Sequence, residues 1–124
     1  MKKFLFCLIA VGLIFIGCQT IRKNYDFDIH ETATREQVKN AILVACEERG
    51  WIAKEKDNST ISAKLLKNGT YEVYIDIIYN ETNYKIEYVD SVNLRAKGKW
   101  IHPAYNKWVT YLHKSINAEL FKIN

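Results

Sequence analysis

The chain has 124 residues, a formal net charge of +4, three cysteines and a single proline. This length is that of one small domain. The charge is too close to neutral, and the lysines and arginines are too scattered, to predict a nucleic-acid partner. The cysteines form no CxxC motif and no HExxH motif is present, so we expect no metal and no cofactor.

Residues 1–17 have the outline of a secretion signal. Lys2 and Lys3 precede a run from Phe4 to Gly17 that contains no charged, amide or hydroxyl side chain. A helix needs roughly 17 to 25 apolar residues to cross a bilayer, so this shorter run favours a segment that is cleaved. Loss of the two lysines with the signal would lower the formal charge from +4 to +2.

The segment that ends this run, Phe15-Ile16-Gly17-Cys18, resembles the bacterial lipobox, although Phe15 stands where that family usually has leucine. The resemblance implies a diacylglycerol thioether on Cys18, cleavage before Cys18, and often acylation of the new amine. Two or three acyl chains hold a protein stably at a membrane. We therefore expect the mature chain to be anchored to a membrane through lipid on Cys18. The alternative is an uncleaved signal-anchor helix in which Cys18 is an internal residue.

The same resemblance predicts the location of the protein. Lipoproteins of this type lie in the bacterial cell envelope, and an aspartate after the cysteine commonly retains them in the inner membrane. Gln19 occupies that position here, which implies the outer membrane, facing the periplasm, in a cell with two membranes. Cys7 would leave with the signal, so Cys46 is the one remaining thiol, and we expect it to be a small buried hydrophobe.

Residues 18–33 are polar and lack a period, and we expect them to form a lipidated tether that lets the domain stand off the membrane. Thr34 to Gln37 fits a capping box. The apolar residues that follow recur at helical spacing, and Gly50 is suited to a left-handed stop. The sequence therefore predicts an amphipathic helix over residues 35–49 that carries Cys46 on its apolar stripe.

From Trp51 onward apolar and polar residues alternate, which is the period of a β-strand. Strands are predicted over residues 51–56, 61–65, 71–79 and 84–88, each with one apolar face. In the first strand either Trp51 and Ala53 or Ile52 faces the core, and the pattern does not decide between these two orientations.

The loops between the strands can be tested against this alternation, because directly paired residues share a face. A two-residue Asn68-Gly69 loop would put Lys64 opposite Val73, on the apolar face. A three-residue loop over 67–69, with Gly69 left-handed, instead pairs Leu65 with Tyr71, Ala63 with Val73 and Ile61 with Ile75. A four-residue loop over 80–83 likewise pairs Tyr79 with Tyr84 and Ile77 with Ile86.

An irregular stretch, SVNLRAKGKWI, precedes the last predicted element. His102-Pro103 is typical of a helix start with proline at the first helical position. Apolar residues then recur at steps of three or four to the end of the chain, at Tyr105, Trp108, Val109, Leu112, Ile116 and Leu120.

The order of elements predicts an α+β domain over residues 34–124. We expect a two-layer sandwich, α-β-β-β-β-α, in which a four-stranded antiparallel meander packs both helices on one face. The other face would carry mainly polar side chains, with Tyr74, Ile78 and Val89 as a possible patch for a partner.

The densest polar cluster falls where the last strand meets the last helix. The segments YVDSVNL and WIHPAYNKWVTYL, with Gly50-Trp51 and the strand pattern, resemble a family of small bacterial lipoproteins of unknown function. The resemblance covers most of the mature chain and implies no activity, because none is established for that family. His30 and His113 lie outside this cluster, and we expect both to be solvated.

This cluster supports three interpretations. As a shallow binding site it would hold a sugar, peptide or small polar ligand with Asp90, Ser91, Asn93, His102, Tyr105 and Asn106. As a hydrolase it would use Ser91 as nucleophile, His102 as base and Asp90 as orienting acid, but neighbouring strand residues point to opposite faces and no nucleophile-elbow glycines are present. As a structural network its polar groups would cap the helix and fill turns while the rings fill the core.

We expect no catalytic residues and favour a non-enzymatic binding or assembly module of the envelope, whose partner is an envelope protein or glycan. The module would act through the exposed sheet face or through the Asp90 to Trp108 cluster. The small hydrolase is one alternative, and a protective or inhibitory lipoprotein is the other.

Overall fold

The computed structural model describes residues 19–20 and 25–123. The predicted signal sequence and Cys18 lie outside the described residues, so cleavage and lipid attachment stay predictions. No helix within the described part of the chain combines the length and the apolar character needed to cross a bilayer.

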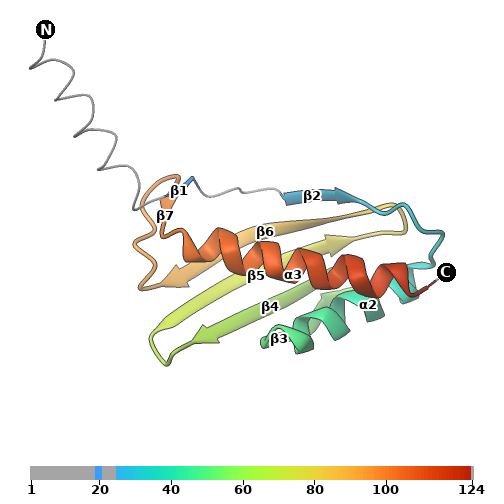
Figure 1. Ribbon diagram of the computed structural model, residues 1–124, viewed down its shortest axis with the longest axis horizontal. Coiled ribbons are helices and arrows are strands. Elements are labelled where there is room, and N and C mark those ends of the chain that lie inside the picture. Colours follow the sequence, from blue (N-terminus) through green and yellow to red (C-terminus); the bar gives the residue numbers. More distant parts are fainter. Residues whose placement is uncertain (1–18, 21–24, 124) are drawn as a thin grey trace, which may run out of the picture.

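The described chain is an α+β fold built on a five-stranded antiparallel sheet with the strand order β2-β6-β5-β4-β3. Figure 1 shows two helices side by side across one face of this sheet. A separate two-stranded ladder joins β1 to β7. The elements in chain order are β1 (Gln19–Thr20), β2 (Tyr25–Asp28), α2 (Arg35–Glu48), β3 (Trp51–Asp57), β4 (Thr60–Lys67), β5 (Tyr71–Tyr79), β6 (Asn83–Val92), β7 (Trp100–Ile101) and α3 (Ala104–Phe121).

The start and end of α2 follow the predicted chemistry. The Thr34 hydroxyl accepts from the Gln37 N–H at 3.1 Å, and the Gln37 side-chain carbonyl accepts from the Thr34 N–H at 2.9 Å. Gly50 has a φ of 81°, a left-handed conformation that glycine adopts at little cost. The capping box and the glycine stop are therefore confirmed.

Helix α3 begins at Ala104, directly after the proline that was predicted to be its first residue. Pro103 has helical backbone angles, and the His102 ring Nδ1 accepts from the Ala104 N–H at 3.0 Å, so histidine caps the first turn. The predicted stripe is buried at Tyr105, Val109, Leu112, Ile116 and Leu120, with Trp108 packed against the same core.

The prediction of a four-stranded sheet is wrong, because the segment expected to be a tether supplies a fifth strand. In β2 the side chains of Tyr25 and Phe27 alternate with those of Asp26 and Asp28, and the strand pairs with the start of β6. The predicted meander of β3, β4, β5 and β6 is present beside it. The ordered chain therefore begins before the predicted domain boundary at residue 34.

The register of the β4–β5 hairpin differs from the prediction by two residues. Lys67 lies opposite Tyr71 and Leu65 lies opposite Val73. The turn has Asn68 and Gly69 at its centre, both left-handed, and Thr70 is an extra residue whose N–H donates to the Lys67 carbonyl at 3.1 Å. Because two residues are one full period of a strand, the apolar face is the predicted one although the partners are not. The pairs predicted across the β5–β6 loop, Tyr79 with Tyr84 and Ile77 with Ile86, are confirmed.

The core lies between the sheet and the two helices. Trp51 is buried and Ala53 packs against the core, whereas Ile52 is 62% exposed, so the ambiguity in β3 is resolved in favour of Trp51. Cys46 is buried, as predicted, and has no disulfide partner within the described residues. Neither helix covers the opposite face of the sheet (Figure 1).

Candidate functional site

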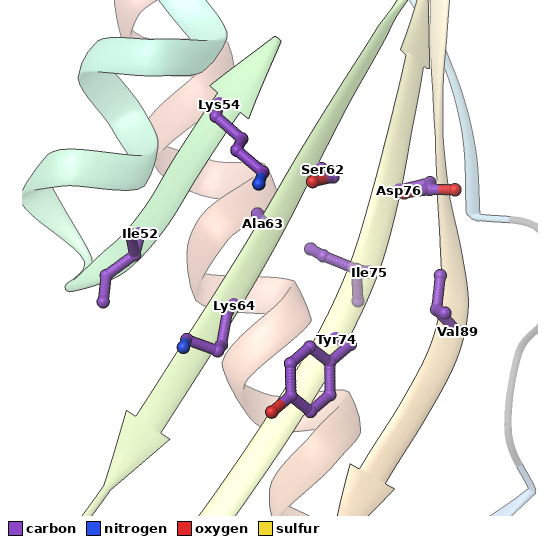
Figure 2. Close-up of a pocket in the computed structure, with 9 residues that line it drawn as sticks. All are labelled: Ile52, Lys54, Ser62, Ala63, Lys64, Tyr74, Ile75, Asp76 and Val89. Carbon is purple, nitrogen blue, oxygen red and sulfur yellow. The ribbon is translucent and has the colours of Figure 1, made fainter. Parts of the chain in front are cut away.

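The uncovered face of the sheet contains a groove of about 400 Å³. Its walls come from four neighbouring strands, because residues that alternate with the core residues point to this side. Figure 2 shows these side chains: Ile52, Lys54, Ser62, Ala63, Lys64, Tyr74, Ile75, Asp76 and Val89. Of the three predicted patch residues, Tyr74 and Val89 line this groove and Ile78 does not. Ile52, which the patch prediction omitted, lines it as well.

Apolar side chains border the groove at positions that solvent reaches. Ile52 on β3 is 62% exposed and Val89 on β6 is 54% exposed. Large aliphatic side chains in such positions lose contact with water when a partner covers them, which favours association.

The polar groups of the groove are arranged by neighbouring side chains. The Tyr74 hydroxyl donates to the Glu72 carboxylate at 2.6 Å, and this hydrogen bond is the main reason that the pKa of Tyr74 is raised. Lys56 pairs with the Asp76 carboxylate at 3.1 Å. The groove therefore offers a neutral phenol and a paired carboxylate beside the ammonium groups of Lys54 and Lys64.

A β-bulge in β6 shapes one side of the groove. Tyr74 lies opposite Asp90 whereas Ile75 lies opposite Tyr88, so Val89 is the extra residue. A bulge changes the direction of the side chains around it. Here it leaves Val89 on the open face, where Figure 2 shows it lining the groove.

Two of the predicted site residues, Asp90 and Ser91, follow this bulge and point to opposite faces of the sheet because they are neighbours in the strand. Asp90 lies opposite Tyr74, whose side chain is on the open face, whereas Ser91 lies opposite the core residue Val73. The Ser91 hydroxyl shares a hydrogen bond of 2.7 Å with the Tyr88 hydroxyl, and the Asp90 carboxylate accepts from the Ser91 backbone N–H at 2.8 Å.

Of the other candidate residues, His102 and Asn106 line one pocket at the start of α3, whereas Asn93 contacts the β4–β5 turn. Asn93 has a left-handed backbone, and its amide donates to the Thr70 carbonyl at 2.8 Å. His102 caps α3, and Asn106 accepts from the Tyr25 hydroxyl at 2.6 Å. The structure therefore does not gather the predicted set into one pocket.

Tyr105 belongs to the core. Its ring is fully buried and meets the Tyr88 ring edge-on, with 5.3 Å between the ring centroids. Its hydroxyl has no hydrogen-bond partner within the described residues, and burial raises the pKa of Tyr105 far above its ordinary value.

The three residues of the hydrolase interpretation are engaged with other groups. The His102 Nδ1 accepts from the Ala104 N–H, the Ser91 hydroxyl bonds to Tyr88, and Asp90 lies toward the opposite sheet face. A nucleophile, base and acid act together only when they form a chain of hydrogen bonds. Among the described residues, no such chain of hydrogen bonds connects the Ser91 hydroxyl, the His102 ring and the Asp90 carboxylate.

The prediction that His113 is solvated is wrong, because its side chain is half-buried. Its ring stacks on Phe27 with 3.5 Å between centroids, and its Nδ1 lies 2.6 Å from the Tyr84 hydroxyl. The His113 Nε2 lies 3.3 Å from the Asn117 amide, whose oxygen accepts from Tyr84 at 3.2 Å. Tyr25 and Phe27 alternate with aspartates, which indicates a strand. This strand covers the part of α3 that carries His113. His30 is exposed, as expected.

Within the described residues, no three His, Cys, Asp or Glu side chains are grouped so that they could hold a metal ion. No protein-family model matches the chain, and no curated protein is significantly similar to it. The resemblance to small bacterial lipoproteins therefore rests on the sequence segments quoted above.

Proposed function

We propose that this protein is a lipid-anchored, non-enzymatic binding module of the bacterial cell envelope and that the open sheet face binds its partner. The observation that carries this proposal is the groove between β3 and β6, which has exposed aliphatic side chains at Ile52 and Val89. The partner is an envelope protein or glycan, since an anchored domain meets these molecules at the membrane surface.

The composition of the groove supports binding in preference to catalysis. Aromatic, aliphatic and amphipathic side chains with a few placed polar groups are typical of recognition surfaces. Tyr74 presents a ring with two rotatable bonds, and its hydroxyl is already oriented by Glu72. Such a side chain gives contact area at a low cost in conformational entropy.

The lipid anchor is tested by the intact mass of the protein from the membrane fraction, measured beside a Cys18→Ala form. We expect loss of residues 1–17 and the added mass of two or three acyl chains, and neither change in the Cys18→Ala form. An unacylated chain, cut elsewhere or uncut, would contradict the anchor and with it the envelope location.

The binding surface is tested in cells with a photo-crosslinking amino acid at Val89. The matched control carries it at Phe121, which is 76% exposed but lies at the end of α3. We expect a defined adduct from Val89 alone. Ile52→Asp should abolish that adduct, because it introduces a charge into the same groove, whereas Val44→Asp on the exposed side of α2 should not. An adduct that survives Ile52→Asp would contradict the sheet face as the binding surface.

A further inference from the structure

The ladder between β1 and β7 brings the start of the predicted mature chain onto the domain. Gln19 pairs with Ile101 and Thr20 pairs with Trp100. Ile101 is fully buried, and the next residue, His102, donates its N–H to the Leu94 carbonyl at 2.8 Å. The backbone immediately after Cys18 is therefore held at this end of the domain, not at the far end of a tether.

The segment beside this ladder, residues 94–100, forms a braced loop. Leu94 is buried at its base. Lys97 and Trp100 exchange two backbone hydrogen bonds of 2.9 Å, and Gly98 makes the tight turn between them with a φ of 58°. Just before the loop, the Asn93 amide donates to the Thr70 carbonyl, which links this end to the β4–β5 turn. The loop thus has a fixed conformation relative to the sheet.

The side chains of this loop are cationic and amphipathic. Arg95, Lys97 and Lys99 are exposed, and none of them forms an ion pair within the described part of the chain. Trp100 is 37% exposed. None of the fourteen acidic residues of the chain lies between Asp90 and Glu119, so the cations of the loop have no acidic neighbour along this part of the sequence.

We propose that the loop 94–100 lies against the anionic phospholipid headgroups of the membrane in which the Cys18 lipid is inserted. This inference rests on the proposed lipid anchor. Lysine and arginine are attracted to an anionic lipid surface within a Debye length, about 8 to 10 Å. Tryptophan favours the membrane interface, and a basic patch strengthens the hold of acyl chains.

This contact would orient the domain. Figure 1 shows β1, β7 and the start of α3 together at one end, and the last turn of α3 at the opposite end. The 18 residues of α3 span about 27 Å, so Phe121 would lie well outside the headgroup layer. The domain would rest on the membrane by its basic end and would not move freely on a tether.

The test uses the lipidated protein reconstituted into vesicles of phosphatidylcholine, with and without phosphatidylglycerol. A spin label is placed at Ala96→Cys in the loop or at the control position Phe121→Cys. Both positions are exposed, whereas the native Cys46 is buried and shielded from the reagent. The readout is collision of the label with a water-soluble relaxation agent and with oxygen, which is enriched in lipid.

We expect the label at Ala96 to show several-fold fewer collisions with the water-soluble agent when phosphatidylglycerol is present, and the label at Phe121 to show no change. The triple variant Arg95→Glu, Lys97→Glu, Lys99→Glu should remove this difference. Its matched control reverses the charges of three sheet lysines, Lys54, Lys56 and Lys64, and should preserve the difference. Circular dichroism verifies that both triple variants are folded.

Two results would overturn the inference, and they are distinguishable. A label at Ala96 that is as accessible to water as the label at Phe121, on protein whose intact mass carries acyl chains, contradicts the loop contact and leaves the anchored binding module standing. A mass without acyl chains removes the anchor, and both proposals fail together.

Discussion

His113 is held in a closed ring of hydrogen bonds. Tyr84 donates to the Asn117 carbonyl oxygen, so its own oxygen is available to accept from the His113 Nδ1–H, and the Asn117 amide then donates to the unprotonated Nε2. Every group in this ring is satisfied when the imidazole is neutral. A second proton on Nε2 would point at the Asn117 N–H2 group, which has no lone pair to accept it.

The first prediction follows from this ring. Burial lowers the pKa of His113 below its ordinary value of 6.5. The folded pKa is therefore below the unfolded one, so the unfolded chain binds the proton first and stability is lost as pH falls below about 6.5. Urea denaturation at several pH values measures this loss. His113→Phe, which retains a ring against Phe27, should flatten the profile between pH 7 and 5, whereas His30→Ala should leave its shape unchanged.

Cys46 gives a second prediction at the residue scale. Burial raises the pKa of its thiol to about 12. Since the thiolate is the reactive form, iodoacetamide should alkylate Cys46 only as fast as the domain opens, and the rate should rise steeply with urea. Replacement by serine should destabilise the fold by about 1 to 3 kcal/mol, because it buries a hydroxyl without a partner. Alkylation at a rate independent of urea would show that the thiol is accessible in the folded state.

At the scale of single elements, local chemistry determines the start of α2. The capping box satisfies two backbone N–H groups that the helix itself leaves without partners. Thr34→Ala should therefore lower the free energy of unfolding by about 1 kcal/mol. Thr110→Ala, on the exposed side of α3, should change it by less than about 0.5 kcal/mol. Thermal or urea denaturation compares the two, and equal losses would mean that the box contributes nothing.

The individual helices and strands also show how far the sequence predicts this fold. The helices, the meander and the buried face all follow from periodicity, because packing against a core imposes a period of two or 3.6 on the residues involved. Strand β2 was missed because only Tyr25 and Phe27 mark it, and aspartates flank both rings. Two apolar positions are too few to distinguish a short edge strand from a polar linker.

The candidate site was less predictable than the fold. The cluster from Asp90 to Asn106 looked dense along the chain, but the alternation of side chains along β6 and the change of direction before α3 send its side chains to different surroundings. Conversely, the groove collects residues from four strands that are scattered in the sequence. A pattern along one strand predicts which side chains share a face, but not which neighbouring side chains they meet.

At the scale of the whole molecule, the core and the proposed binding surface lie on opposite faces of the sheet. The helix-covered face holds the core, whereas Ile52 and Val89 stand on the open face. The double variant Ile52→Asp, Val89→Asp should therefore leave the free energy of unfolding within about 0.5 kcal/mol per site of the parent value while it abolishes partner capture. Urea denaturation measures the first effect, and crosslinking from a photoreactive residue at Lys54, which also lines the groove, measures the second. A large loss of stability would show that the open face supports the fold itself.

Thr70, the extra residue of the β4–β5 hairpin, has a consequence for how the length of this loop can change. Residues inserted or removed between Lys67 and Tyr71 leave this pair, and therefore every pair beyond it, in the same register. Removal of Thr70 would join the two strands by Asn68-Gly69 alone, and both of these residues already have the positive φ that a two-residue type I′ turn requires. The hairpin is therefore expected to tolerate loss of Thr70 with the same side chains facing the core.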